Sequence, residues 1–236
     1  MYPMDHAIIM ASGQGTRLRP LTLQTPKPLI RIANKPMIET VLNALCQRKV
    51  QKIAVVVGYL GEQFSYLPQK YPNVQLIQNK NYASENNISS VYTAKQLLME
   101  NHNCFICEAD LWLSRPEILC LDVKQSCYFG RQFTGYCDDW VLEQDAQGRL
   151  TRVGKGGHDC CALAGISYFT AKDARLLANF IETAYSYPGN RNKFWDEIVN
   201  EHLDSLDMTV HVIQDEDIHE IDTVEELTEM RVRYGE

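Results

Sequence analysis

The sequence has no excess of basic residues. Its 236 residues include 23 lysines and arginines against 30 aspartates and glutamates, which gives a formal net charge of −7. Proteins that bind nucleic acid nonspecifically need clustered positive charge, so this balance argues against nucleic acid as a partner. Any anionic substrate must therefore be held by a few local cations.

Long apolar runs are also missing. A helix that spans a bilayer needs about 20 consecutive apolar residues, and no run in the chain approaches that length. The first six residues, Met-Tyr-Pro-Met-Asp-His, carry no basic region before an apolar core, unlike a secretory signal peptide. We therefore expect a cytoplasmic protein without membrane insertion.

The eight cysteines lack the spacing of a metal site. Cys104 and Cys107 form a CxxC pair, but no second pair stands where a zinc site would need one. The chain is neither short nor visibly secreted, so a disulfide framework is not expected either. Because the pair lies in an apolar stretch, we expect buried, reduced thiols in a strand.

Two well-known nucleotide-binding loops are absent from the glycine-rich stretch 13–29. A dinucleotide fingerprint would need a third glycine where Leu18 stands, after Gly13 and Gly15. A P-loop would need Gly-Lys-Ser/Thr after its spacer, and this region has none.

The same stretch nevertheless suits a polyphosphate. It follows the apolar run 7–11, and its two glycines allow a sharp turn that brings backbone N–H groups close to an anion. Arg17, Arg19 and Lys27 add positive charge along one loop. A plain surface loop between a strand and a helix is the alternative.

Apolar runs alternate with helical spacing through the first half of the chain. Strands are predicted at 7–11, 53–57, 74–77 and 104–108, and helices from Pro36 and over 88–99. This alternation predicts an α/β fold, a Rossmann-like doubly wound mixed sheet in three layers. We expect one domain over residues 1–236.

The pattern changes after Pro116. Strands are predicted at 126–129, 141–143, 150–153 and 162–169, with a turn at 145–148. Strands that follow strands indicate antiparallel pairing, so we predict a small β-ribbon insertion at about 126–168. The remaining predicted elements are helices at 171–185 and 194–203, strands at 208–213 and 218–221, and a last helix opened by the capping box Thr223–Glu226.

Acidic residues follow two of the predicted strands. Asp110 follows the strand 104–108 and Asp222 follows the strand 218–221, and alternation places Glu108 and Glu220 on the same faces as these two. Two carboxylates from separate strands can hold Mg²⁺ together with substrate phosphates and water. The alternative is that they cap helices or strand ends, since Asp222 precedes a predicted helix.

Two further segments have open interpretations. The stretch 79–90 is rich in amides and hydroxyls, which read a base edge or form ordinary turns and caps; for Ser84 and Asn86 the cap explanation is at least as good. Lys155 lies in the glycine-rich stretch 154–157, which we predict to be a mobile turn. It is either a second phosphate-binding lysine or a solvated loop residue.

The long motif Gly-x-Gly-Thr-Arg-Leu-x-Pro-Leu-Thr, followed by Pro-Lys-Pro-Leu, resembles that of the nucleoside-triphosphate nucleotidylyltransferases. Further matches run in order over nearly the whole chain. They are Asn86, Asn87, Ser90, Tyr92, Glu108 to Asp110, Trp140, Gly165 to Ser167, Phe194 to Glu197 and Glu220 to Asp222. They narrow the resemblance to the bacterial CTP:phosphocholine cytidylyltransferases.

This resemblance implies a Mg²⁺-dependent enzyme that joins CTP to phosphocholine and releases pyrophosphate. It implies catalytic roles for Lys27 and Arg17, and magnesium binding by Asp110 and Asp222. The implied nucleotide-binding residues are Ala11, Ser12, Gly13, Gly15, Thr16, Arg17, Gly58, Tyr59, Tyr82, Ser84, Asn87 and Ser90. The family has a D-x-D-like element at this place, and its first acid is a glutamate here, Glu108. The role of Glu108 therefore stays open.

Recognition of choline requires shape, aromatic faces and negative charge, because a quaternary ammonium donates no N–H hydrogen bond. Trp140 and Trp195 are the candidates for the aromatic surface, and Asp196 and Glu220 for the balancing charge. A tryptophan in the core is the alternative for each.

Two other functions remain open. One is a nucleotidylyltransferase that activates a sugar 1-phosphate or 2-aminoethylphosphonate. The other is a regulatory module that binds a nucleotide without turnover, against which the set Arg17, Lys27, Asp110 and Asp222 speaks. The sequence assigns no oligomeric state.

Overall fold

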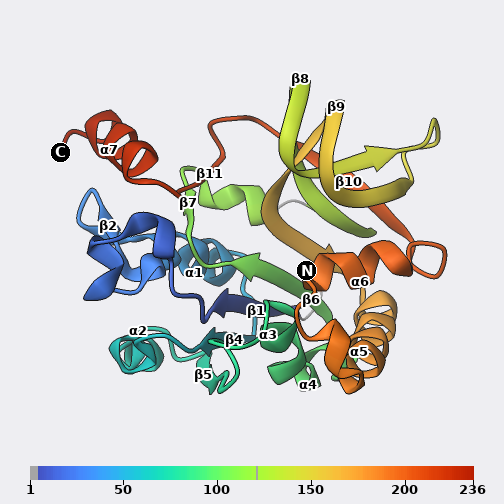
Figure 1. Ribbon diagram of the computed structural model, residues 1–236, viewed down its shortest axis with the longest axis horizontal. Coiled ribbons are helices and arrows are strands. Elements are labelled where there is room, and N and C mark those ends of the chain that lie inside the picture. The colour runs from blue at the N-terminus through green and yellow to red at the C-terminus, as the bar shows by residue number, and fades with distance from the viewer. Residues whose placement is uncertain (1–4, 121) are drawn as a thin grey trace.

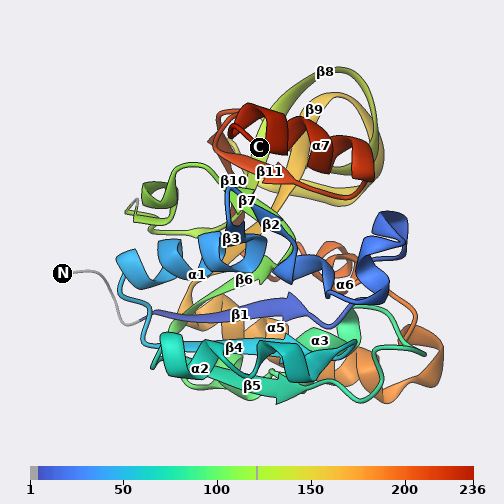
Figure 2. The same cartoon turned by 90° about the vertical axis from the view of Figure 1, so that its left-hand side faces the viewer.

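The computed structural model describes residues 5–120 and 122–236. A seven-stranded mixed sheet with the order β10-β8-β9-β6-β1-β4-β5 forms its centre. Four neighbouring strands pair parallel with one another: β1 (Asp5–Ala11), β4 (Lys52–Val57), β5 (Val74–Gln78) and β6 (Asn103–Glu108). In Figure 2, β1, β4 and β5 run side by side in one direction. The predicted Rossmann-like mixed sheet is confirmed, and so are these four strands.

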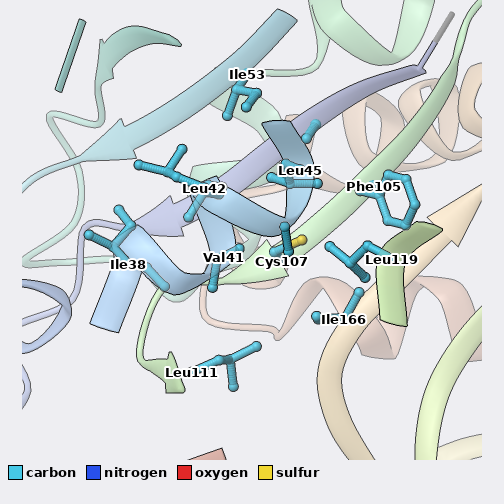
Figure 3. Close-up of a cluster of buried hydrophobic side chains, with 14 of the residues drawn as sticks. Ile38, Val41, Leu42, Leu45, Ile53, Phe105, Cys107, Leu111, Leu119 and Ile166 are labelled. Carbon is cyan, nitrogen blue, oxygen red and sulfur yellow. The ribbon is translucent and has the colours of Figure 1, made fainter. Parts of the chain in front are cut away.

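Both faces of the sheet are covered because its strands are apolar on both sides. Ile9 and its even-numbered neighbour Ile8 on β1 belong to two different core clusters, one on each face. On one face, helix α1 (Met37–Gln47) packs through Ile38, Val41, Leu42 and Leu45 (Figure 3). The other face carries α3 (Ile88–Thr93), α4 (Gln96–Met99), α5 (Ala171–Ser186) and α6 (Trp195–Glu201). The result is three layers.

The prediction of a single helix over 88–99 is wrong, because two helices occupy this range. The range is divided into α3 and α4, because the backbone at Ala94 leaves the helical conformation (φ −100°, ψ 6°). The CxxC thiols of Cys104 and Cys107 lie buried in β6, as predicted.

The four strands predicted between 126 and 169 are the ends of two long ones. Strands β8 (Ser126–Gln144) and β9 (Leu150–Phe169) pair antiparallel, with several register shifts along their length. They leave the sheet as a ribbon at the top of Figure 1. The predicted turn at 145–148 is confirmed by the bond from Gly148 N–H to the Asp145 carbonyl (3.0 Å). The predicted turn at 154–157 is wrong, because Gly154, Lys155 and Gly157 pair with β8 and the segment lies within β9.

The C-terminal part adds one strand to the central sheet and one to a separate two-stranded sheet. Strand β10 (Met208–Ile213) pairs parallel with β8, and β11 (Ile218–Glu220) pairs antiparallel with β7 (Leu111–Leu113). Helix α7 (Val224–Arg233) begins at the predicted capping box and lies beside the short hairpin of β2 (Arg31–Ile32) and β3 (Lys35–Pro36). The remaining α-helix is α2 (Leu67–Lys70).

Six short 3₁₀ helices complete the described chain: Thr16–Leu18, Leu21–Leu23, Lys27–Leu29, Gly61–Phe64, Pro116–Cys120 and Pro188–Asn190. None of the helices in residues 5–120 and 122–236 combines the length and the apolar character that crossing a membrane requires.

Candidate active site

A cavity of about 490 Å³ opens at the carboxyl ends of β1 and β6. Ser12 and Gly13 follow β1 and line it, as do Glu108 and Asp110 at the end of β6. A second hollow of about 270 Å³ adjoins it and is lined by the glycine-rich loop and Lys27. This edge of an open α/β sheet is where ligands bind, so the two hollows form one candidate site.

The glycine-rich loop needs its glycine at position 15. Gly15 has φ 59°, and a Cβ there would lie 2.8 Å from Cβ of Lys27. The Thr22 hydroxyl donates to the Gly15 carbonyl (2.9 Å), which fastens the turn. Ala11, Gly13, Gly15 and Thr16 line the smaller hollow, whereas Arg19 lines neither.

Gly58 and Tyr59 support this loop from behind. The Tyr59 N–H donates to the Ser12 carbonyl (3.1 Å) and its hydroxyl to the Thr22 carbonyl (2.9 Å). A Cβ at Gly58 would lie 2.6 Å from Cγ of Tyr82, so the glycine lets the Tyr82 ring approach the main chain. Of Gly58, Tyr59 and Tyr82, the three residues predicted to contact the nucleotide, Tyr82 lines the large cavity, and Gly58 and Tyr59 lie behind the loop.

Lys27 stands at the centre of the charged groups. Its side chain is only 9% exposed, and its ammonium bonds to the carboxylates of both Asp110 and Asp222. Burial opposes the charged form, but the two carboxylates hold the pKa of Lys27 above its usual value. Arg17, which is largely exposed, donates to the same Oδ1 of Asp222 (2.6 Å). Burial likewise opposes ionisation of Asp222, and Lys27 and Arg17 hold its pKa below its usual value.

Main-chain pairing brings Asp110 and Asp222 together. Leu111 of β7 faces Glu220 of β11 in the antiparallel ladder. One step further along, the Ile221 N–H donates to the Asp110 carbonyl (3.3 Å). The two aspartates that the sequence placed after separate strands therefore meet across this ladder and share the Lys27 ammonium.

Two more carboxyl groups, those of Glu108 and Glu220, lie beside Asp110 in the large cavity. Glu108, Asp110 and Glu220 each offer an oxygen within 4.8 Å of the other two. Burial, with the neighbouring Glu220 and Asp110, raises the pKa of Glu108 well above its usual value. Burial, with Asp110 and Asp222, raises the pKa of Glu220 to about 8. A cation bound among these crowded carboxyl groups would stabilise their ionised forms, so the arrangement favours one.

The donor set fits magnesium. Mg²⁺ takes oxygen ligands and is commonly held by one or two carboxylates together with substrate phosphates. Asp110 and Asp222 already share one positive charge, the Lys27 ammonium, and both line each of the two hollows. The tighter acidic group includes Asp110 but has Glu108 and Glu220 in place of Asp222.

A buried polar network forms the wall on the β1 side. The hydroxyls of Ser12 and Ser90 are 2.8 Å apart, and Asn79 Nδ2 donates to the Ser90 hydroxyl (3.2 Å). Asn87 lines the same wall, and its Oδ1 accepts from the main-chain N–H of Trp195 (2.9 Å). Ser84 is exposed, and its hydroxyl donates to the Asn81 carbonyl (3.3 Å), which favours the turn interpretation for it.

The ribbon closes the opposite side of the cavity. Trp140 of β8 lies edge-on to Phe194, with ring centroids 5.3 Å apart. Lys155 of β9 pairs in register with Trp140, and its Nζ is 5.4 Å from the centroid of the Phe194 ring. Lys155 therefore faces the cavity from a strand. The glycines around Lys155 in the sequence favour a turn, so the sequence alone did not indicate that Lys155 faces the cavity from a strand.

Trp195 and Asp196, predicted in the acceptor pocket, lie in the core instead. Trp195 is 3% exposed and stacks on Tyr128, with ring centroids 5.9 Å apart. Asp196 accepts from the Tyr128 hydroxyl (2.9 Å), and burial raises its pKa to about 7. The residue that faces the cavity is the preceding Phe194, because successive residues at the start of α6 point in different directions.

Several known proteins are similar to this chain over part or nearly all of its length. The family model described as nucleotidyl transferase matches residues 6–121. A 2-aminoethylphosphonate cytidylyltransferase of Lancefieldella rimae is 50% identical over 94% of this chain and 90% of its own length. A choline-phosphate cytidylyltransferase of Streptococcus pneumoniae is 34% identical over 93% of this chain and 94% of its own.

Among solved structures, the CTP:phosphocholine cytidylyltransferase of Streptococcus pneumoniae superposes with a TM-score of 0.89. The two sequences are 32% identical, and the match covers 98% of this chain and 99% of the other.

Proposed function

Because this chain belongs to the nucleotidyl transferase family, with cytidylyltransferases as its full-length relatives, we propose that it transfers CMP from CTP to a small zwitterionic acceptor. The acceptor carries a phosphate or phosphonate at one end and an ammonium group at the other, and pyrophosphate is released. The observation that carries this proposal is the Lys27 ammonium held between Asp110 and Asp222 beside the glycine-rich loop.

The reaction is an in-line displacement at phosphorus. An acceptor oxygen attacks the α-phosphorus, and the bond to the β-phosphate breaks, so that pyrophosphate leaves with the bonding electrons. No covalent enzyme intermediate is needed, and catalysis consists of positioning and charge stabilisation. Backbone N–H groups of the loop and Arg17 hold the triphosphate, and Lys27 stabilises the charge gathered between the α-phosphate and the acceptor.

Asp110 and Asp222 are the residues that would hold magnesium. Bound there, Mg²⁺ supplies positive charge against the phosphate oxygens. Lys155 adds a second lysine on the ribbon side of the cavity.

The acceptor we propose is 2-aminoethylphosphonate, the substrate named for the relative at 50% identity. A primary ammonium donates three N–H bonds, and the cavity floor supplies acceptor oxygens from Glu108, Asp110 and Glu220. Phosphocholine, the acceptor expected from the sequence, is the second candidate. The aromatic edge formed by Trp140 and Phe194 favours it, because a quaternary ammonium is recognised by aromatic faces.

A panel of substrates tests the proposal. Pyrophosphate release is measured with each nucleoside triphosphate against 2-aminoethylphosphonate, phosphoethanolamine, phosphocholine and glucose 1-phosphate. Phosphoethanolamine has the amine of the first acceptor and the phosphate ester of phosphocholine, so it separates the contributions of the two ends. We expect CTP to be preferred and 2-aminoethylphosphonate to be the best acceptor.

Other outcomes point elsewhere. Efficient turnover of glucose 1-phosphate, without turnover of the three acceptors that carry an ammonium group, would overturn the choice of acceptor. It would leave the proposed nucleotidyl transfer standing. Nucleotide binding without pyrophosphate release from any acceptor would favour the regulatory module.

A further inference from the structure

The main chain of Asp222 is held by a side chain from the next helix. One carboxylate oxygen of Glu226, Oε2, accepts from the N–H groups of both Asp222 (2.7 Å) and Thr223 (2.8 Å). In return, the Thr223 hydroxyl accepts from the Glu226 N–H (3.2 Å). A capping box needs only the bonds between the N-cap residue and the third helical residue. The bond to Asp222 is an addition to that motif.

Asp222 is thereby clamped from two sides. On its N-terminal side, the Ile221 N–H donates to the Asp110 carbonyl (3.3 Å). On its C-terminal side, Glu226 holds the N–H of Asp222 itself. Between these points, the Asp222 carboxylate accepts from Lys27 and Arg17. Loss of the Glu226 bonds leaves the main chain of Asp222 fastened on one side only.

Helix α7 gives Glu226 a fixed base. Leu227 and Met230 are buried in a cluster with Leu18 of the glycine-rich loop, Trp112 of β7 and Ile221. Near the end of the helix, the Arg231 guanidinium donates to the Arg31 carbonyl (3.1 Å). The helix therefore packs against the segments that carry Arg17 and Asp110, and Glu226 connects it to Asp222.

We propose that Glu226 is a positioning residue for the transfer reaction, which acts by holding the Asp222 carboxylate against Lys27 and Arg17. This inference rests on the proposed function, in which Asp222 takes part in the reaction. Displacement of a participating group by about 1 Å costs up to about 10²-fold in rate. We therefore expect Glu226→Ala to lower kcat by roughly 10-fold or more, with the KM of the acceptor little changed.

Matched variants separate positioning from helix stability. Glu226→Gln keeps an oxygen that accepts both N–H bonds, so it should restore most of the turnover. Glu225→Ala removes the same charge from the first turn of the same helix, but Glu225 is exposed and makes no hydrogen bond to the described residues. It should turn over like the wild type. Thr223→Ala weakens the helix cap while leaving Glu226 able to hold Asp222. Its melting temperature should therefore fall, while its kcat should change little.

A double-variant cycle tests whether Glu226 acts through Asp222. If it does, Glu226→Ala should cost little in the Asp222→Asn background, because the group that it positions has already been altered. Should Glu226→Ala not fold, Glu226→Asp replaces it in the cycle. Aspartate keeps the charge in the first turn of the helix, but its shorter side chain draws the accepting oxygen away from the N–H groups of Asp222 and Thr223.

The outcomes are distinguishable. A folded Glu226→Ala variant with wild-type kcat, or a full additive loss in the double variant, overturns the positioning role and leaves the proposed function standing. Wild-type turnover of Asp222→Asn overturns the role of Asp222 in the proposed function, and the inference on Glu226 falls with it.

Discussion

Lys27 offers the sharpest test of the site, because one ammonium satisfies two carboxylates. In Lys27→Ala, Asp110 loses its cation and Asp222 keeps only Arg17, whose side chain is 67% exposed. The substitution therefore has two consequences, one for stability and one for turnover, and they can be measured separately.

The loss of stability follows from the burial of the groups. Removal of one partner from a buried ion pair costs about 3–5 kcal/mol. The side chains of Asp110 and Asp222 retain 22% and 13% exposure, so water relieves part of the repulsion between them. We expect a loss near the lower end, about 3 kcal/mol, in the free energy of unfolding.

The loss of turnover follows from the charge of the transition state. Two phosphates approach each other at Lys27, and a positioned cation in a site with little water is worth several kcal/mol. A fall in kcat of roughly 10²-fold, or about 2.7 kcal/mol in the activation free energy, is the minimum that we expect.

Urea unfolding and pyrophosphate release measure the two effects on the same preparations. Lys172→Ala is the matched control, because Lys172 is exposed in the first turn of α5 and lines neither hollow. Mg²⁺ should raise the stability of Lys27→Ala more than that of the wild type, since the carboxylates released by the lysine bind a cation. A folded variant with near-normal kcat would refute the assigned role of Lys27.

Three further predictions concern the metal, the acceptor and the pH dependence. Asp110→Asn and Asp222→Asn should each raise the Mg²⁺ concentration needed for half-maximal turnover, because each removes a charged ligand; unchanged magnesium titrations in both would rule out the pair. Trp140→Ala and Glu220→Gln should raise the KM of the acceptor more than that of CTP, and an equal rise for both substrates would contradict the placement of these residues on the acceptor side. The pKa of Asp196 is about 3.8 in the unfolded chain and about 7 in the folded protein. Between these pH values the unfolded chain binds fewer protons than the folded protein, so the free energy of unfolding of the wild type falls as pH rises. Asp196→Asn keeps an acceptor for Tyr128 and should remove this dependence, which amounts to at most about 4 kcal/mol; parallel stability–pH curves for the two proteins would show that Asp196 is not the source.

The local patterns of the sequence determined most of the sheet and one end of the site. Apolar runs such as 53–57 predict strands buried on both faces, because only such strands can be apolar at every position. The capping box at Thr223 and Glu226 predicts the start of the last helix. The glycine-rich loop after β1 and Asp110 after β6 are placed at one sheet edge by the shared direction of these two strands. Asp222 follows β11, which lies outside this sheet.

Only the tertiary structure decided the acceptor side of the cavity. Lys155 sits among glycines that are typical of a turn, yet cross-strand pairing with Trp140 keeps it extended and turns it toward the cavity. Trp195 and Phe194 are neighbours with similar apolar character, and the packing of α6 buries the first and exposes the second to the cavity. The residue types around a position are a local property of the sequence. Strand register and helix orientation depend instead on which surfaces are buried together. The sharing of the Lys27 ammonium between Asp110 and Asp222 likewise arises from the pairing of β7 with β11, which joins residues far apart in the chain.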